Sequence, residues 1–522
     1  MARPLADTTK WVLDRLDRPV RKPRSRRGVA LLLALVTITV LSATVVEFLY
    51  QTRVNFALAA NERDQLKAYH LARSAVNLSR LLLSFQYALA DESRETEDDM
   101  GRLIGRAMRR SNFQIYQYID LLMGPFNSGR IESPIGGINL SDTGVEGFGD
   151  FTGEMAVDVV PEDGRINVNV FASAKLDQDA LSQMCAMLLD AQHDELFERK
   201  DENGVLLDRA TVLGRIVDYL DYDEQAVVIG EGCTVTGNAG DEMGPYETFG
   251  SKRQIEPPNR AITHVNELRK VAGIDDVFME AFADQLTVYP VGKPNINVAQ
   301  APVFYAILCR NVQLPGQSGT TGLDLCARDP GIALQVLWFS MALDGLRAFF
   351  ENPMSVLLAY VGSTESKLLP SAKKGQPVAF LSVSQFPNYI KDFQASAPLM
   401  AQFIQYSPLY QQLAVLNPAM MIDPLAPQFP AWTVEFDKGG LMKSVSVETP
   451  KIYRIYATGQ YGTTEATIEA VIDFDKTVRR LPDEKQLEAQ ESDPERLKEL
   501  KAAVKDTRAA MPKGRWMYWR EY

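Results

Sequence analysis

Two acidic segments near the middle of the chain carry carboxylates that could together bind a metal ion. Asp221, Asp223 and Glu224 lie in the first segment, and Asp241 and Glu242 lie in the second. Calcium binds about six to eight hard oxygen atoms, often from closely spaced carboxylates in a flexible loop. The spacing here is not that of an EF-hand, so the sequence leaves two interpretations open, a calcium site and a solvated acidic loop.

The other reactive side chains form no recognisable catalytic motif. The three histidines, His70, His193 and His264, lie far apart in the sequence. The sequence also contains no nucleophile elbow, HExxH zinc motif, phosphate-binding loop or dinucleotide fingerprint. We therefore expect that the protein is not an enzyme.

The four cysteines, Cys185, Cys233, Cys309 and Cys326, include no CxxC pair, so no zinc or redox motif is indicated. If the chain is exported, one or two disulfides could form, and Cys309 and Cys326 are the nearest pair. Buried free thiols are the alternative.

Two segments look like helix-hairpin-helix elements, which in other proteins bind DNA phosphates through backbone amides near a glycine. They are VNELRKVAGIDD at 265–276 and PNINVAQAPVFYAIL at 294–308. Asp275 and Asp276 follow the first turn, and the chain has a net charge of −12, of which residues 29–522 contribute −18. DNA binding depends on cationic surface, so a packing role is favoured over binding of nucleic acid.

An apolar run near the N-terminus predicts a membrane anchor. Residues 28–46 carry no charge, and Glu47 ends the run. The run matches the roughly 30 Å core of a bilayer and exceeds the apolar core of a secretory signal. Basic residues precede it, namely Arg21, Lys22, Arg24, Arg26 and Arg27. These predict a single-pass protein of the inner membrane with a cytoplasmic N-terminus and a periplasmic body.

The helix does not stop at the membrane. Apolar residues recur in steps of three and four from Ala68 to Leu89, and no Pro or Gly occurs from Val29 to Ala90. We predict one helix of about 60 residues, roughly 90 Å long. Its first half is apolar all round, and its second half is amphipathic.

Further along, the patterns predict strands. Segment 153–171 is expected to form a strand, a turn at Asp163–Gly164 and a second extended piece. Segment 432–448 is expected to form a hairpin around Gly439–Gly440, and 451–475 a second strand pair.

Segment 332–350 is apolar enough to suggest a second membrane span. Asp344 and Arg347 lie within it, and they favour a buried helix instead. The last segment, GRWMYWREY, combines aromatic and basic residues, and we expect it to pack on the body of the protein.

Several segments, taken in this order, resemble the minor pseudopilin K family of bacterial type II secretion systems. They are RRGVALLLALVTITVL at 26–41, EDGRINVN at 162–169, RIVDYLDYDEQ at 215–225, PPNRAITHVNELRKVAGID at 257–275 and TVYPVGKPNINVAQAP at 287–302. The resemblance implies an α+β, type IV pilin-like fold. In that fold a long N-terminal transmembrane helix packs on an antiparallel sheet, and a large helical domain of helix-hairpin-helix or SAM-like type is inserted.

The resemblance also suggests domain boundaries. These are a basic prepilin leader at 1–28, the pilin helix at 29–90, the first part of the pilin-like domain at 91–170, the inserted helical domain at 171–310, an enlarged helical region at 311–430, the C-terminal strands at 431–475 and a charged tail at 476–522.

The family implies processing and a metal ion. A prepilin peptidase would cut between Gly28 and Val29 and methylate the new amine of Val29. Calcium would bind at the acidic segments described above. The implied role is to help start and cap the pseudopilus that drives folded proteins through the outer membrane.

Leu33 is a departure from general pilins that supports a position at the tip. Pilins resemble each other in a Glu five residues into the mature helix, thought to pair with a neighbour's N-terminal charge. A carboxylate in hydrocarbon is costly without such a partner. A subunit with Leu33 has no need of a subunit ahead of it, as expected of a first subunit.

The implied partners are the minor pseudopilins I and J, the major pseudopilin, the prepilin peptidase and the inner membrane. Contacts with the secretin or with exported cargo are left open. The alternatives are a minor pilin of a type IV pilus, a membrane-anchored DNA-binding receptor with helix-hairpin-helix elements, and an anchored enzyme.

The mature N-terminus tests this interpretation directly. We expect mass spectrometry of the assembled protein to find a chain that begins at methylated Val29, because the basic leader is removed and the apolar run is kept. Retention of Met1 in the mature protein would overturn it.

Overall fold

The computed structural model describes residues 27–90, 114–119, 123, 130–131, 138–139, 153–173, 175–197, 199–200, 204–247, 257–315, 322–351, 380, 382–416, 421–423, 427–474, 496–501 and 514–522. The predicted leader up to residue 26 and most of the predicted charged tail lie outside these residues. The chain divides into two compact units, Met1–Lys67 and Ala68–Tyr522.

The predicted long helix is confirmed as α2, Arg27–Ala90, an unbroken helix of 64 residues. Its apolar part has the length and composition of a membrane span, with a mean hydropathy of 2.6 and none of that window buried in the protein. The hydroxyls of Thr37, Thr39 and Thr44 donate to carbonyl oxygens three residues earlier in the same helix. These polar groups are therefore satisfied within the helix, as hydrocarbon requires.

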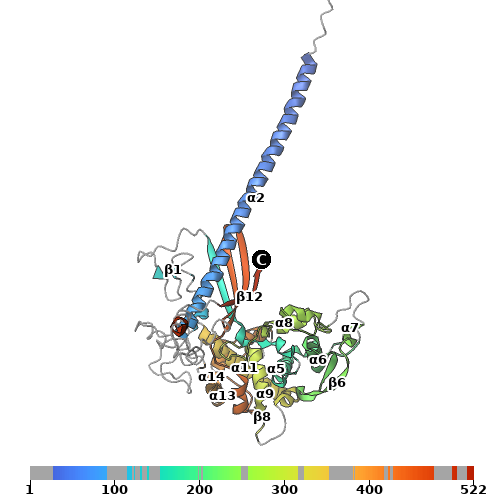
Figure 1. The fold of residues 1–522 in the computed structure, drawn as a ribbon, viewed down its shortest axis with the longest axis vertical. Coiled ribbons are helices and arrows are strands. Elements are labelled where there is room, and N and C mark those ends of the chain that lie inside the picture. Colours follow the sequence, from blue (N-terminus) through green and yellow to red (C-terminus); the bar gives the residue numbers. More distant parts are fainter. Residues whose placement is uncertain are drawn as a thin grey trace, which may run out of the picture. The chain divides into compact units, whose positions relative to one another are not determined.

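Four antiparallel strands form the main sheet, in the order β12-β11-β10-β3 (Figure 1). Their bounds are Glu154–Pro161 for β3, Ile452–Tyr461 for β10, Thr464–Asp473 for β11 and Arg515–Glu521 for β12. The last strand confirms that the C-terminal aromatic segment packs on the body. It forms an edge of the sheet, which therefore extends beyond the predicted strands.

The second half of α2 packs directly on this sheet. Ala68, Ala72 and Ala75 are fully buried, and they bring the helix backbone close to β10. A Cβ atom on Gly459 would clash with the carbonyl oxygen of Ala68 and lie 2.5 Å from the amide nitrogen of Ala72. The predicted arrangement of a long N-terminal helix on an antiparallel sheet is therefore confirmed.

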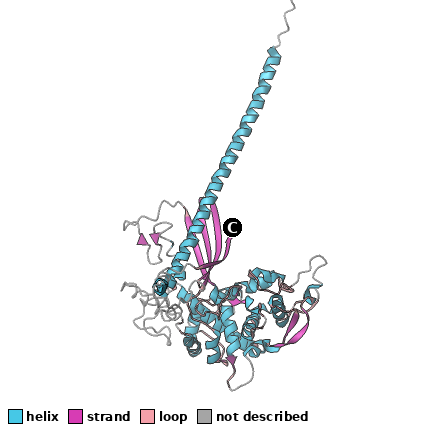
Figure 2. Ribbon diagram, viewed as in Figure 1, coloured by secondary structure: helices cyan, strands magenta, loops and turns pink. Residues whose placement is uncertain are grey.

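A largely helical region is inserted between two neighbouring strands of the sheet (Figure 2). β3 ends at Pro161 and its neighbour β10 begins at Ile452. The helices in between are α5 Gln178–Leu188, α6 Arg209–Leu220, α7 Gly244–Glu247, α8 Asp276–Phe282, α9 Ala301–Asn311, α10 Gly322–Arg328, α11 Pro330–Glu351, α13 Phe386–Ala395, α14 Ala397–Ile404, α15 Pro408–Leu416 and α16 Lys438–Ser444. Side chains from both sides of residue 310 share one buried core, and the domain boundary there stays a prediction.

Short strands complete the described elements. β1 Arg130–Ile131 pairs with β2 Ile138–Asn139, β4 Ile166–Asn167 with β7 Leu286–Thr287, β5 Gln225–Ile229 with β6 Val235–Asp241, and β8 Val312–Gln313 with β9 Glu435–Phe436. The second extended piece expected after Gly164 is only the two-residue β4. The 3₁₀ turn Val168–Phe171 follows it, and the Asn167 side chain caps this turn.

The apolar helix α11 lies in the protein interior, as its charged residues predict. Of its most apolar window, 78% is buried. Asp344 accepts hydrogen bonds from Arg347 at 2.9 Å and from the Ser407 hydroxyl at 2.7 Å. A Cβ atom on Gly345 would clash with the carbonyl oxygen of Phe403, so α11 and α14 cross in close contact.

The hairpin predicted around Gly439–Gly440 is wrong. The segment forms helix α16, and the preceding β9 pairs with β8 instead. Asp437 caps the helix, because its carboxylate accepts hydrogen bonds from the amides of Gly439 and Gly440, each at 3.0 Å. An aspartate at this position satisfies two otherwise unpaired amides and starts a helix where the two glycines alone indicate a turn.

The close approach at Gly459 predicts the effect of a small substitution. Gly459→Ala should destabilise the detergent-solubilised protein by about 1–3 kcal/mol, because the added methyl group must push α2 away from β10. Thermal unfolding measures this loss.

Gly292→Ala is the matched control, since a Cβ there meets nothing within 4 Å. We expect it to stay within about 0.5 kcal/mol of the unchanged protein. Equal midpoints for the two variants would contradict the direct packing of α2 on β10.

Candidate metal centre

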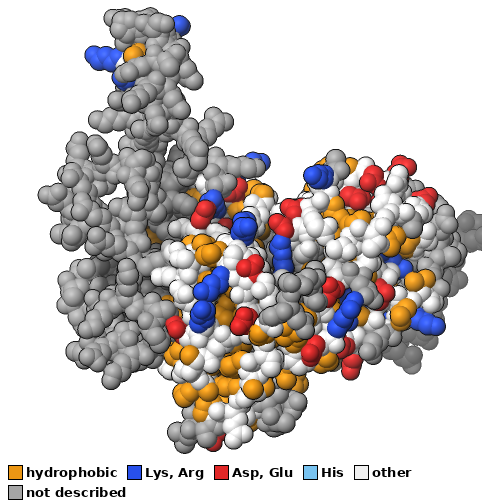
Figure 3. All heavy atoms as spheres, turned by 90° about the horizontal axis from the view of Figure 1, so that it is seen from below, with side chains coloured by type: hydrophobic (Ala, Val, Ile, Leu, Met, Phe, Trp, Pro, Cys, Tyr) orange, Lys and Arg blue, Asp and Glu red, His pale blue; other side chains and the backbone are white. Residues whose placement is uncertain are grey.

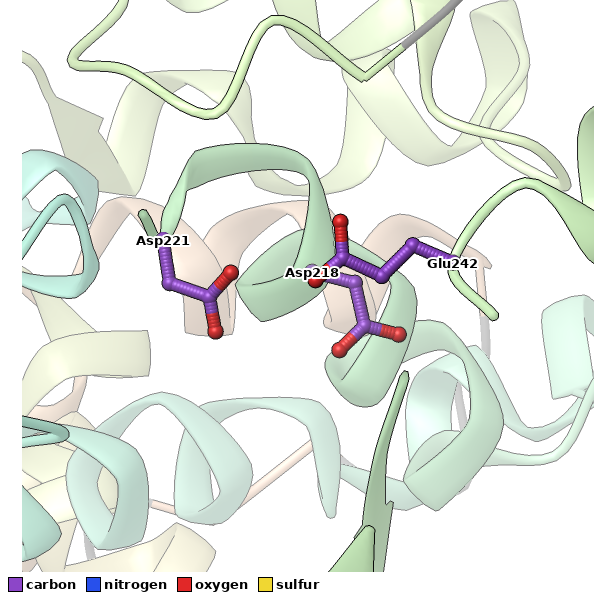
Figure 4. A group of neighbouring side chains, drawn as sticks. All are labelled: Asp218, Asp221 and Glu242. Atoms are coloured by element: carbon purple, nitrogen blue, oxygen red, sulfur yellow. The ribbon is translucent and has the colours of Figure 1, made fainter. Parts of the chain in front are cut away.

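Three carboxylates meet where a helix and a hairpin end. Asp218 lies in the last turn of α6 and Asp221 directly follows that helix, whereas Glu242 directly follows β6. One oxygen atom from each of these carboxylates lies within 4.8 Å of the other two. Figure 4 shows the carboxylates of Asp218 and Glu242 beside each other, with Asp221 pointing toward them from the helix end.

Asp218 and Glu242 are buried and Asp221 is half-buried, and some oxygen atoms of this cluster accept no hydrogen bond. The exposed fraction is 7% for Asp218 and 4% for Glu242. One Asp218 oxygen accepts a hydrogen bond from the Val227 amide at 2.8 Å. Asp221 Oδ1 and Glu242 Oε1 are buried, and no described N–H or O–H group donates to them. Such acceptors are costly unless a proton or a cation binds them.

Burial and mutual repulsion raise the pKa of all three carboxyls. The pKa of Glu242 is raised to about 8, first by loss of solvent and then by the charges of Asp221 and Asp218. The pKa of Asp218 is raised to about 7, mainly by desolvation and also by the charges of Asp221 and Asp223, while the hydrogen bond from the Val227 amide lowers it in part. The pKa of Asp221 is raised to about 6 by desolvation and by Asp223. Without added positive charge, the cluster therefore does not readily hold three negative charges near neutral pH.

Asn259 lies beside the cluster and contacts Glu242. Its side-chain amide donates to the backbone oxygen of Asp223 at 2.6 Å and to Glu242 Oε2 at 3.2 Å. Its own Oδ1 is buried and accepts no hydrogen bond from a described group. Its backbone has a φ of 45°, in the left-handed region that asparagine tolerates better than most residues.

Of the five carboxylates singled out in the sequence, the structure brings Asp221 and Glu242 together. Asp223 and Asp241 accept hydrogen bonds from the amides of Gln225 and Met243, so each stabilises a local turn. Glu224 is exposed.

Asp218 and Asn259 are not among the residues predicted from the sequence. Asp218 lies three residues before Asp221, a spacing that places both side chains on the same side of a helix end. That spacing was an available signal for Asp218. Asn259 comes from a loop distant in sequence, and nothing in its own segment indicates this role.

The geometry fits a hard cation. The donors are all oxygen atoms, three of the residues are acidic, and three buried acceptor atoms lack a described donor. Calcium prefers this chemistry. Calcium binding itself stays a prediction.

Disulfides join the four cysteines in pairs. Cys309 is bonded to Cys326, the pair that the sequence analysis named as nearest, and Cys185 is bonded to Cys233. The second pair connects α5 to the turn between β5 and β6.

The turn at Gly273, in the first helix-hairpin-helix-like segment, packs on the protein itself. The 3₁₀ helix Val265–Lys270 precedes it and α8 follows it, so two short helices flank Gly273. The backbone oxygen of Ala272 accepts a hydrogen bond from Arg215, and the backbone amide of Ala272 donates to the Tyr246 hydroxyl.

On the face shown in Figure 3, the described acidic and basic side chains are interspersed. That face therefore presents no basic stripe among its described residues, the usual footprint of DNA binding.

Gly28, Val29 and Leu33 lie in the first turns of α2. Val29 is 67% exposed and Leu33 is 64% exposed. Cleavage, methylation and tip position stay predictions.

No protein-family model and no curated protein sequence matches this chain. Among solved structures, the chain is similar to the GspK-GspI-GspJ complex from the type 2 secretion system of enterotoxigenic Escherichia coli. The sequence identity is 13% and the TM-score is 0.36, over 80% of this chain and 93% of the other chain. We draw no functional conclusion from a likeness of this size.

Removal of the cation should destabilise the protein. Calcium added to chelator-treated protein should raise the midpoint of thermal unfolding, since a ligand at 100 times its Kd stabilises by about 2.7 kcal/mol. Asp218→Asn should abolish this response. It should not destabilise the calcium-free protein, because it removes one of three repelling charges and keeps an acceptor for the Val227 amide.

Glu224→Gln is the control, since Glu224 is exposed and outside the cluster; it should keep the full response to calcium. An unchanged midpoint after chelation in the parent protein would instead favour an acidic cluster that holds protons.

Proposed function

We propose that this chain is a minor pseudopilin, a membrane-anchored and non-enzymatic assembly protein. It helps start and cap the pseudopilus of a type II secretion system and so supports export of folded proteins across the outer membrane. The observation that carries this proposal is α2, a single unbroken helix with an apolar first part and a second part that belongs to the core of the folded body.

An anchor of this kind suits a filament subunit better than a tethered enzyme or receptor. A tether commonly ends in a flexible linker that lets its domain move, whereas α2 continues without Gly or Pro into the contact with β10. Removal of the helix would expose the apolar side of the sheet. The same helix thus supplies both the apolar segment and part of the core of the body, as suits a subunit that is pulled from the membrane into a filament.

The exposed surface of the anchor offers small residues for packing against sister helices, namely Ala30, Ala34, Ser42 and Ala43. Helices in membranes associate through such residues because their backbones can approach closely. The sister helices would be those of minor pseudopilins I and J and of the major pseudopilin. Before this packing, a prepilin peptidase would cut between Gly28 and Val29 and methylate Val29.

The cation is the second part of the proposal. Calcium would bind to Asp218, Asp221, Glu242 and Asn259. Its role would be structural, because it would neutralise buried charges and fix the end of α6 to the end of β6. The periplasm, where the body would lie, is open to calcium from outside the cell.

Position in the filament can be tested at Leu33. A glutamate at the fifth mature position suits a shaft subunit, which has a neighbour ahead to pair with it, and is a cost for a tip subunit. We expect Leu33→Glu to reduce export of a secreted protein as much as Leu32→Glu does, because both place an unpaired carboxylate in hydrocarbon.

Leu32→Glu is the matched control for the general cost of a charge in the membrane, since Leu32 is similarly exposed at 67%. Normal export with Leu33→Glu and impaired export with Leu32→Glu would indicate a shaft subunit.

Crosslinks to minor pseudopilins I and J, made in cells that carry all subunits, test the partners. Crosslinks along the whole shaft would contradict the tip position.

A further inference from the structure

The hairpin of β5 and β6 needs support from outside itself. Most of its described side chains are exposed or half-buried, and among those whose burial is described only Ile229 is buried. Its register is interrupted between Gln225 and Val227 and again between Val228 and Ile229. An isolated two-stranded hairpin is at best marginally stable in water. Its conformation therefore depends on what holds its two ends.

A disulfide holds the closed end. The turn Glu231–Cys233 joins the strands, and Cys233 is bonded to Cys185 of α5. The Gln178 side chain, also on α5, donates to the backbone oxygen of Cys233 at 3.0 Å. Cys233 itself has a φ of 59°, which a residue with a side chain seldom adopts without constraint. The covalent link to α5 supplies that constraint.

The candidate metal centre holds the open end. Asp218 binds the amide of Val227 in β5, and Glu242 directly follows β6. A ligand that draws Asp218, Asp221 and Glu242 together would therefore also draw together the two strands at their open end. The same hairpin is thus fixed by a covalent bond at one end and by the carboxylate cluster at the other.

We propose that the Cys185–Cys233 disulfide and the cation site are thermodynamically coupled through this hairpin. The disulfide strengthens cation binding, and the bound cation protects this disulfide from reduction. Coupling between two ligands or bonds that stabilise one conformation is reciprocal. The inference rests on the proposed cation site and adds a redox control of its affinity.

Reduction proceeds by thiol–disulfide exchange with an external dithiol. A thiolate of the dithiol attacks one sulfur and releases the other cysteine as a thiolate. The second thiol of the reagent then attacks the mixed disulfide and releases the remaining cysteine. The protein gains two electrons and two protons as the thiols of Cys185 and Cys233, and the reagent becomes a disulfide. Both cysteines are buried, 4% and 5% exposed. The reagent therefore reaches them when the hairpin opens, and a cation at the open end makes that opening rarer.

The second disulfide provides a matched control. Cys309–Cys326 connects α9 to α10 and encloses none of the cluster residues. It is a stringent control because α10 is close to the hairpin turn, where a Cβ on Gly232 would lie 2.9 Å from Asp324. If loss of a disulfide merely loosened this part of the protein, calcium binding would therefore weaken both in a variant without Cys185–Cys233 and in one without Cys309–Cys326.

Calcium affinity of the detergent-solubilised full chain, measured by titration calorimetry, tests the coupling. Cys185→Ser with Cys233→Ser should weaken binding by about 5-fold to 150-fold, the usual range of coupling between sites. Cys309→Ser with Cys326→Ser should stay within about 2-fold, as expected for uncoupled sites. Unchanged affinity in the first variant would overturn the inference and leave the cation site intact. Failure of the parent protein to bind calcium would overturn the cation site itself.

A second measurement needs no cysteine variant and so does not depend on how such variants fold. Reduction of the parent protein by dithiothreitol, followed by alkylation and mass spectrometry, gives a rate for each disulfide. Calcium should slow reduction of Cys185–Cys233 and leave Cys309–Cys326 unchanged, and Asp218→Asn should remove the protection. Equal rates for Cys185–Cys233 with calcium and with chelator would overturn the coupling.

Discussion

The contact between the backbone of α2 and that of β10 at Gly459 is the constraint on which the rest of the body depends. Because no side chain separates the two backbones, the alanines of α2 and the alternate apolar residues of β3, β10 and β11 share one core. The apolar side of the sheet is covered in this way by the anchor helix. Tyr69 of α2 donates to Glu521 of β12, and Arg80 lies over the ring of Trp516, so the C-terminal strand also contacts the helix.

The inserted region is connected to this sheet by buried polar contacts at the points where the chain leaves it and returns. Glu162, which directly follows β3, is fully buried and forms ion pairs with Arg165 and Arg454. The carboxylate of Asp163 accepts hydrogen bonds from the amides of Lys451 and Ile452, both at 3.0 Å. The EDGR segment thus fixes both ends of the insertion. Loss of the groups that pair with these carboxylates would leave the carboxylates buried without partners. This costs far more free energy of folding than the loss of an exposed ion pair.

Elements with a strong local signal could be predicted from the sequence. The length of α2 follows from the absence of Gly and Pro over more than sixty residues, and β10 and β11 follow from alternating apolar residues around a glycine turn. The segment at Gly439–Gly440 could not be assigned correctly from its glycines, because the cap from Asp437 decides its conformation. The pairing of β3 with β10, across the whole insertion, depends on contacts between distant segments and has no local signal. Asn259 is another such case, since its role depends on where a distant loop lies.

Burial divides the carboxylates of the acidic region into two groups, where the sequence leaves a calcium site and a solvated loop as alternatives. A solvated acidic loop keeps its carboxylates in water, where mutual repulsion is weak and each pKa stays near its usual value. Asp223, Glu224 and Asp241 are exposed, as that interpretation requires, whereas Asp218 and Glu242 are buried beside each other. The negative charges of the acidic region are therefore compensated in two different ways. In the exposed part, water compensates the charges. In the buried part, a bound proton or a bound cation has to compensate them. A bound calcium ion would neutralise two charges and bind several oxygen atoms at once, whereas a proton neutralises one charge and bridges two oxygen atoms.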